Sequence, residues 1–213
     1  MKPIPITRDI TAKEVRFIRK QRASLARRRA KLWQRSLFGY VVIFGILALL
    51  TIWAEGKNPI YILAFWTILG MAIAIPGFIQ EWRRLSARIA DFDYALAKGR
   101  CEELVIASRR MWEFEEQEDE GACYAFELSS GGVIFVTGQD FYAGARFPNT
   151  DFSIIEILDS RQVVLEMILE KRGDKMSPER RLSAKEKKGM SIPDHGSYFV
   201  GALEDVCGAH TNA

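Results

Sequence analysis

The sequence predicts an α+β membrane protein in which a two-helix transmembrane hairpin is followed by a small antiparallel β-rich cytoplasmic domain. Residues 37–79 contain two long apolar stretches, which predict membrane helices. The residues from Cys101 onward form short runs rich in Val, Ile, Phe and Tyr between turn residues, which predict strands. Charge is divided unevenly, because residues 1–36 hold twelve Lys or Arg against two acidic residues and residues 80–213 hold seventeen against twenty-four. This arrangement argues against a soluble single-domain protein.

Residues 1–36 form a basic segment that we predict to be helical and cytoplasmic. Residues 11–34 contain neither Gly nor Pro, and Thr11 and Glu14 match a capping box at the start of a helix. Next to a membrane, such a segment attracts anionic headgroups. Two alternatives stay open: binding of nucleic acid, which the lack of a base-reading motif disfavours, and neutralisation by the acidic remainder of the chain. The basic residues expected to face lipid are Arg27, Arg28, Arg29, Lys31 and Arg35.

Residues 37–54 and 60–79 predict two transmembrane helices of about 27 and 30 Å, close to the thickness of the hydrocarbon core of a bilayer. The five residues between them require an antiparallel hairpin, so both outer ends face the same side. Lys57 is the only basic residue of that short connection, whereas many basic residues flank the two outer ends. The positive-inside rule therefore predicts that both termini are cytoplasmic.

The two predicted membrane spans contain few polar side chains. No ionisable residue lies at depth in either span, which disfavours a proton or ion path. Thr51 and Thr67 are expected to return their hydroxyl groups to the backbone of the preceding turn. Gly70 and Ala74 form a pair of small residues that would let another helix pack closely, and the alternative is a passive anchor.

Residues 80–98 predict a juxtamembrane helix, and Gly99 is expected to end it in the left-handed conformation. Residues 101–205 then predict the β-rich domain, as a curled sheet or a small barrel. The tightest hairpin is expected at Ser129-Ser-Gly-Gly132. Residues 173–190 are interpreted as a solvated excursion and residues 206–213 as a flexible end. The predicted strands are residues 103–115, 123–128, 133–136, 152–158, 162–170 and 198–200.

One segment of this domain resembles a known pattern. An acidic Asp-Glu-Gly turn at residues 118–121, followed by a hairpin that ends in Gly138-Gln139, resembles a recurring segment of about forty residues in uncharacterised bacterial membrane-associated proteins. The resemblance implies a bacterial source and hence the bacterial inner membrane. It implies no activity.

No sequence motif for catalysis is present. The chain lacks a P-loop, a G-x-G-x-x-G fingerprint and a nucleophile elbow, and its two histidines, His195 and His210, stand outside any recognised motif. We therefore expect no catalytic residue, no cofactor and no metal site. An acidic cluster is the candidate interaction surface, with a solvated strand edge and a metal site as the alternatives. Its residues are Glu115, Glu116, Glu118, Asp119 and Glu120.

The sequence thus favours a membrane-anchored cytoplasmic protein-interaction or regulatory module of unknown pathway. Its expected partners are the lipid bilayer and either a second protein or another copy of itself. The alternative is an accessory subunit of a transporter or channel that acts through its transmembrane helices, with Gly70 and Ala74 at the contact. A third class, a tethered enzyme using Asp140 and Asp151, is the least favoured.

Overall fold

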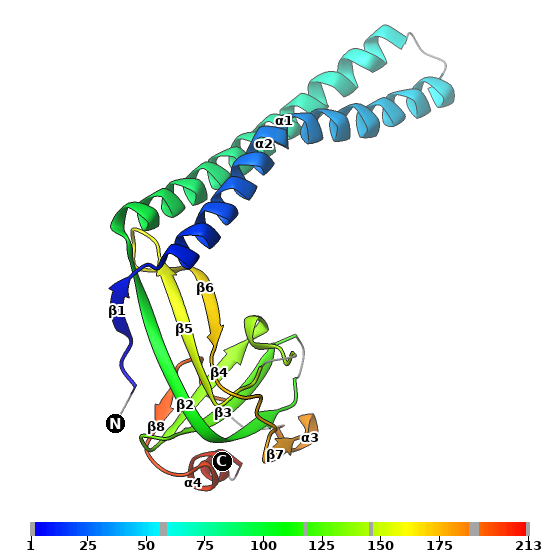
Figure 1. Ribbon diagram of the computed structural model, residues 1–213. Coiled ribbons are helices and arrows are strands. Elements are labelled where there is room, and N and C mark those ends of the chain that lie inside the picture. Colours follow the sequence, from blue (N-terminus) through cyan, green and yellow to red (C-terminus); the bar gives the residue numbers. More distant parts are fainter. Residues whose placement is uncertain (1–2, 56–58, 117–118, 145–146, 188–191, 212–213) are drawn as a thin grey trace. The chain divides into compact units, whose positions relative to one another are not determined.

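The computed structural model describes residues 3–55, 59–116, 119–144, 147–187 and 192–211 (Figure 1). The chain is α+β, with two long apolar helices and an antiparallel sheet. It divides into two compact units. The helical unit contains residues 10–99 and 159–161, and the β unit contains the remaining residues.

The helical unit is a hairpin of α1 (Ala12–Glu55) and α2 (Pro59–Lys98). With 44 and 40 residues, these helices are about 66 and 60 Å long. The basic segment and the first apolar stretch are therefore one helix, as are the second apolar stretch and the juxtamembrane segment. No helix breaker lies at either junction, and Pro76 lies within α2 without ending it.

Three local predictions for the hairpin are confirmed. At the start of α1, the backbone N–H of Thr11 donates to the carboxylate of Glu14 at 2.7 Å, and the N–H of Glu14 lies 3.4 Å from the Thr11 hydroxyl oxygen. Gly99 ends α2 with a φ of 64°, a conformation that costs glycine little. The hydroxyl prediction is confirmed for Thr51 only, whose hydroxyl donates to the carbonyl of Leu47, one turn earlier, at 2.8 Å.

The polar part of the hairpin is held by contacts between its two helices. The guanidinium group of Arg22 donates to Asp93 at 2.5 and 3.1 Å, and that of Arg28 donates to Glu81 at 3.1 Å. Apolar residues of α2 are buried in the same region, including Leu85. Part of the basic segment is thus neutralised within the helical unit itself.

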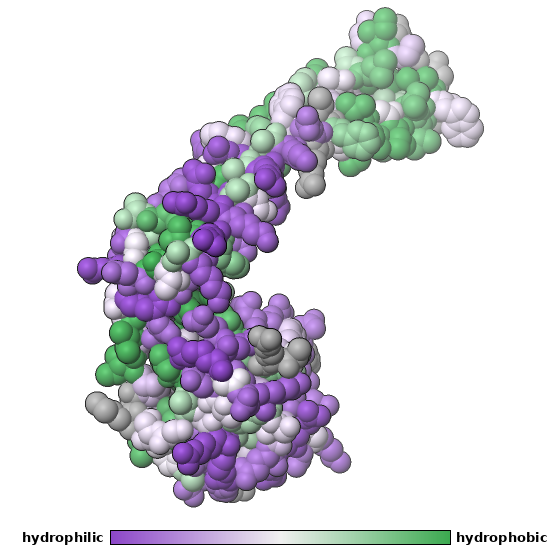
Figure 2. Space-filling model, viewed as in Figure 1, coloured by the Kyte–Doolittle hydropathy of each residue, from purple (hydrophilic) through white to green (hydrophobic). Residues whose placement is uncertain are grey.

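The apolar part of the hairpin exposes its side chains. Both helices are long and apolar enough to cross a membrane, and only 6% and 11% of their most apolar windows are buried. Figure 2 shows a hydrophobic surface around the end where α1 finishes and α2 begins, and a mainly hydrophilic surface further along the hairpin. The indole N–H of Trp66 in this apolar part is satisfied, since it donates to the Thr51 hydroxyl at 3.1 Å.

The β unit is built around one mixed sheet in the order β6-β5-β2-β3-β4-β8, with β1 and β7 also paired to β2. All pairings are antiparallel except that of β7 with β2. The sheet does not close, so the barrel alternative is wrong. The strands are β1 (Ile6–Asp9), β2 (Arg100–Phe114), β3 (Ala122–Leu128), β4 (Val133–Gly138), β5 (Asp151–Leu158), β6 (Val164–Lys171), β7 (Arg180–Leu182) and β8 (Tyr198–Phe199).

Strand β2 serves two parts of the sheet. Its first half pairs with β1 and β5, and its second half pairs with β3 and β7. A register shift between Ser108 and Arg110 separates the halves, and the Ser108 hydroxyl oxygen lies within 2.8 Å of the carbonyl oxygens of Arg110 and Glu127. Such a bulge turns a strand and changes which side chains face the core, so that Ile106 and Met111, of opposite parity, share one cluster.

Two apolar clusters form the interior of the β unit. The first gathers alternate residues of β2 to β5 around the aromatic rings of Tyr124, Phe126 and Phe152. The second uses the other faces of β3 and β4 and is covered by Leu182 of β7 and Leu203 of α4 (Leu203–Thr211). Period-2 alternation explains how one strand contributes to both clusters.

The hairpin at residues 129–132 is confirmed. Gly131 and Gly132 have φ values of 93° and 84°, and β3 and β4 pair from Glu127↔Val133 outward. Two other predictions are wrong. Residues 173–190 are not only a solvated excursion, because Leu182 is fully buried and a short helix, α3 (Ala184–Lys187), follows it. Residues 206–213 are not a flexible end as a whole, because Val206 and Cys207 of α4 are buried in the second cluster.

Candidate functional site

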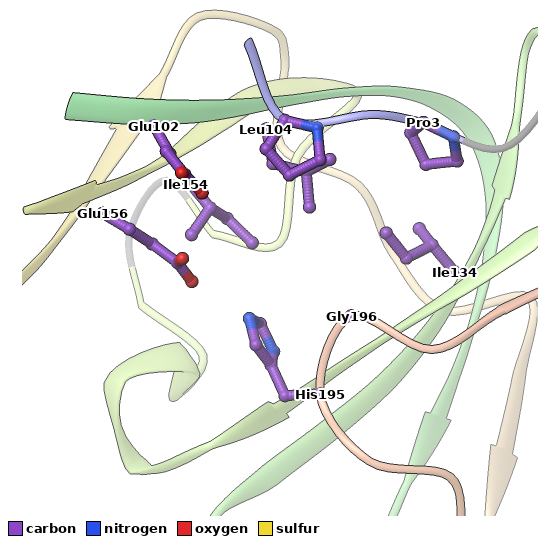
Figure 3. Close-up of a pocket in the computed structure, with 9 residues that line it drawn as sticks. Pro3, Glu102, Leu104, Ile134, Ile154, Glu156, His195 and Gly196 are labelled. Carbon is purple, nitrogen blue, oxygen red and sulfur yellow. The ribbon is translucent and has the colours of Figure 1, made fainter. Parts of the chain in front are cut away.

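A cavity of about 220 Å³ opens in the β unit and is a candidate site (Figure 3). Its walls come from separate parts of the sheet: β2 and β5 carry two glutamates, β4 supplies Ile134, and the turn before β8 supplies a histidine. The segment that precedes β1 forms a further wall with Pro3 and Pro5. We call this cavity the Glu–His pocket. Its lining residues are Pro3, Pro5, Glu102, Leu104, Ile134, Ile154, Glu156, His195 and Gly196.

The two glutamates of the pocket are direct neighbours across the sheet. Glu102 of β2 is paired with Glu156 of β5 in the antiparallel ladder. They lie on the same face of their strands as Leu104 and Ile154, which contact the first apolar cluster. Like charges placed directly opposite each other destabilise a sheet. Within the described part of the chain, neither carboxylate has a hydrogen bond or an ion pair. No described cationic side chain therefore neutralises their charge.

The third polar group is His195, whose ring makes two contacts and whose turn is itself held in place. Its Nδ1 accepts a hydrogen bond from the backbone N–H of Thr137 at 3.2 Å, and its ring stacks on Phe141 with centroids 5.0 Å apart. The turn that carries it is fixed to β4, because the N–H of Gly196 donates to the carbonyl of Phe135. Gly196 has a φ of 78°, which favours glycine at this place in the turn.

These contacts determine what His195 presents to the pocket. Since Nδ1 accepts, the proton of the neutral ring is on Nε2. Figure 3 shows the imidazole pointing into the same space as the carboxylates of Glu102 and Glu156. Burial lowers the pKa of His195, an effect partly offset by the negative charge of Asp140. The ring is therefore predominantly neutral at pH 7.

The pKa of Glu156 shifts in the opposite direction to that of His195. Burial, and then the charge of Glu102 across the ladder, raise the pKa of Glu156 above its ordinary value of 4.5. An ionised Glu156 is thus under electrostatic stress that a bound cation would relieve. In the described part of the chain, no group of three or more His, Cys, Asp or Glu side chains is placed to hold a metal ion. The arrangement suits a positively charged organic group between apolar walls.

The acidic cluster expected to be an interaction surface is largely engaged inside the β unit. Glu115 accepts a hydrogen bond from the N–H of Ala184 at 2.8 Å, and Glu116 accepts from the hydroxyl of Tyr142 at 2.7 Å. Glu120 forms an ion pair with Lys187, whose side chain is only 4% exposed. These carboxylates position the loops around β7 and α3. Asp119 is exposed, and Glu118 lies outside the described residues.

The other predicted site residues lie in the helical unit. Gly70 faces α1, because a Cβ placed there would lie 2.9 Å from the Phe44 ring and would also meet Tyr40. Its close approach is therefore made within the hairpin. Ala74 lines a separate apolar crevice. Arg28 pairs with Glu81 and Arg29 contacts Ser86, whereas the side chain of Arg35 lies outside the described part. Arg27 and Lys31 have no ion pair within that part.

The carboxylates considered for catalysis do not meet at the pocket. Asp151 forms an ion pair with Arg172 at 3.2 Å. Asp140 lies in a short 3-10 helix, η1 (Gln139–Phe141), and acts on His195 through its charge. Neither is among the residues that line the Glu–His pocket.

No protein-family model, no curated protein and no solved structure matches this chain. The site must therefore be judged on its own geometry. Sequence reasoning missed Glu102, Glu156 and the position of His195. A signal was available for the glutamates, because each follows the parity of apolar core positions in its strand, where a charge is unusual. Nothing local indicated that the His195 turn would reach them.

Proposed function

We propose that the chain is a membrane-anchored binding module with an interaction or regulatory role. In this proposal α1 and α2 cross the bacterial inner membrane as a hairpin, and the β unit, on the cytoplasmic side, binds a protonated amine in the Glu–His pocket. The observation that carries the proposal is the opposed, unneutralised pair Glu102 and Glu156 at core-facing positions, beside a neutral imidazole.

Membrane insertion is supported by the exposure and spacing of aromatic residues. Trp33 and Trp53 lie twenty residues apart on α1, and Tyr61 and Trp82 lie twenty-one apart on α2. Each pair is therefore separated by about 30 Å along its helix, which matches the hydrocarbon thickness of a bilayer. All four rings are exposed, as expected of side chains that favour the interface between lipid and water.

The orientation rests on the distribution of basic residues. Twelve Lys or Arg precede the apolar part of α1, and three Arg follow that of α2 before residue 89, whereas the connection holds only Lys57. Positive charge is retained on the cytoplasmic side during insertion. This distribution supports a cytoplasmic position for both termini and, with them, for the β unit.

The ligand chemistry follows from the pocket. An ammonium group between two carboxylates gains charge-assisted hydrogen bonds from both and removes their mutual repulsion. The apolar walls formed by Leu104, Ile134 and Ile154 suit the alkyl chain of a lysine side chain or of a diamine. Because the pKa of Glu156 is raised and that of His195 is lowered, binding should weaken as the pH falls: Glu156 loses its charge and His195 gains a positive one.

The binding test uses the full chain in detergent micelles and two probes. The first is a short uncharged peptide with a central lysine, and the second is 1,5-diaminopentane. Saturable binding by calorimetry, weakened about tenfold or more by Glu156→Gln, is expected. Glu103→Gln is the matched control, since Glu103 lies on the opposite face of β2, and it should leave binding unchanged. Equal binding by wild type and Glu156→Gln would refute the ligand assignment.

The peptide and the diamine distinguish the source of the amine. Preference for the peptide supports a protein partner, and preference for the diamine supports a small-molecule sensor. The anchor is tested separately by alkaline carbonate extraction of membranes, in which the chain should remain with the lipid. The second candidate is an accessory subunit contacting a channel through Gly70 and Ala74, and it is less well supported because Gly70 packs on Tyr40 and Phe44 of its own hairpin.

A further inference from the structure

We propose that the hairpin carries a specific site for one anionic phospholipid, with an acyl chain in the apolar crevice between α1 and α2 and the phosphate group on Arg29. The inference rests on the membrane insertion proposed above. It concerns the helical unit alone and is independent of the ligand of the Glu–His pocket.

The crevice has a volume of about 210 Å³ and an almost wholly apolar lining. It extends along α1 from Trp33 to Tyr40, a distance of about 10 Å. The Tyr40 hydroxyl donates to the carbonyl of Thr67 at 2.9 Å, so only the apolar ring is offered to an occupant. The lining residues are Trp33, Ser36, Tyr40, Met71, Ala74, Ile75 and Phe78.

The shape of the crevice favours a flexible chain over another helix. Its small residues, Ser36 and Ala74, line it together with larger side chains, and the rings of Trp33 and Phe78 contact each other edge-on at 5.7 Å. Close packing of a second helix needs small residues along a whole face, so that two backbones can approach. An acyl chain needs only a narrow apolar slot.

A basic group stands directly beside this slot. Arg29 precedes Trp33 by one helical turn, and its guanidinium lies 5.8 Å from the ring of Trp82, which itself follows Phe78 by one turn. Arg29 is therefore on the same face of the hairpin as the crevice. One of its N–H groups donates to the Ser86 hydroxyl at 3.3 Å, and its other donors have no partner in the described part of the chain.

The chemistry of Arg29 matches a lipid phosphate. Guanidinium groups bind phosphate oxygens with two parallel hydrogen bonds, which a screened surface lysine does not do. Trp33 and Trp82 flank the position, as expected at the depth where headgroups meet acyl chains. Other basic residues nearby, such as Lys31 and Arg84, raise the local concentration of anionic lipid. The charge and the slot together select an anionic phospholipid.

The experiment is native mass spectrometry of the full chain, released from detergent after equilibration with phosphatidylglycerol and phosphatidylcholine of identical acyl chains. The wild type is expected to retain one phosphatidylglycerol in preference to phosphatidylcholine. Arg29→Gln should reduce that preference by about fivefold or more, because it removes the charge-assisted hydrogen bonds between the guanidinium group and the phosphate. Arg27→Gln removes the same charge from a different face of α1 and should preserve the preference. Ala74→Phe fills the slot and should reduce retention of both lipids.

Five results would overturn the inference. Equal losses in Arg27→Gln and Arg29→Gln would indicate unspecific attraction to a charged surface, and unchanged retention in Ala74→Phe would show that the slot is not the site. Conversion of a dimer to a monomer by Ala74→Phe, without lipid loss, would assign the crevice to a second copy of the chain. If the wild type stays in carbonate-washed membranes but shows no lipid preference in the mass spectra, this inference alone is refuted. If carbonate extracts the wild type from the membrane, the proposed anchor is refuted as well.

Discussion

Replacing Glu156 by Gln is expected to stabilise the β unit at pH 7.5 while it weakens binding in the Glu–His pocket. Glu156 stands directly opposite Glu102, and no described side chain neutralises the pair. The substitution keeps the size of the side chain and removes one of two repelling charges. A residue that costs stability and serves binding is a recognised compromise at functional sites.

The size of the expected stabilisation follows from the separation of Glu102 and Glu156, which are paired across the two strands. Side chains directly opposite each other have their Cβ atoms about 5 Å apart. At that separation two unit charges repel by about 3 kcal/mol at an effective dielectric constant of 20, and by about 1 kcal/mol in water. Glu156 is only partly buried, so the lower figure applies. We expect a gain of about 1 kcal/mol, which slows global exchange of amide hydrogens about fivefold.

The assay is hydrogen–deuterium exchange of peptides from β2 and β5 in the full chain. The sign depends on pH: because the pKa of Glu156 is raised in the fold, its stabilising neutral form is present at low pH and is lost as the pH rises through the folded value. The gain from Glu156→Gln should therefore be full at pH 7.5 and vanish near pH 4. Faster exchange at pH 7.5, or a gain independent of pH, would refute the reasoning.

Glu103→Gln is the control with the opposite sign. Glu103 is adjacent in β2 but faces away from the pocket, where the hydroxyl of Ser153 and the guanidinium of Arg8 lower its pKa below the ordinary 4.5. Its charge therefore stabilises the fold above that value, and the stabilisation is lost on acidification. The substitution should speed exchange at pH 7.5 and have less effect near pH 4.

Three further predictions concern packing and capping. Leu203→Ala should destabilise the β unit by about 3 kcal/mol, because this fully buried side chain packs α4 on the sheet, and exchange in β3 reports it. Gly70→Ile should lower the melting temperature of the helical signal, because the new side chain would push α1 away from α2. Gly77→Ile is the control and should leave it unchanged, since a Cβ at Gly77 has nothing within 4 Å. Equal effects of the two substitutions would contradict the assigned packing. Thr11→Ala should cost the helical unit about 1 kcal/mol and speed exchange in the first turn of α1 only.

Features with local causes were predictable from the sequence. The capping box at Thr11, the left-handed Gly99 and the hairpin through Gly131 and Gly132 each depend on residues within a few positions of one another. The length and apolar character of α1 and α2 follow in the same way from an unbroken helical pattern. The absence of a helix breaker in residues 80–98 likewise indicates a helix that extends from the second apolar stretch, as α2 does.

Features that depend on distant partners were not predictable. Strand β1 exists because Asp9 pairs with Arg100, and β7 exists because Arg180 pairs with Trp112. Neither segment has an alternating pattern of useful length. The bulge in β2 also reverses the inward parity between Ile106 and Met111, so that a simple alternation fails across it. The Glu–His pocket shares this origin, since its polar groups come from segments far apart in the sequence.

The pairing of β1 with β2 has a consequence for how the chain is made. Asp9 and Arg100 are neighbours in the sheet, yet the whole helical hairpin is synthesised between them. Domains emerge from the ribosome N-terminal end first, so the earliest strand must wait until both long helices have been made. Pro3 and Pro5 can close their wall of the cavity only then. The Glu–His pocket is thus completed late in biosynthesis, so the amine binding proposed for it would be withheld from unfinished chains.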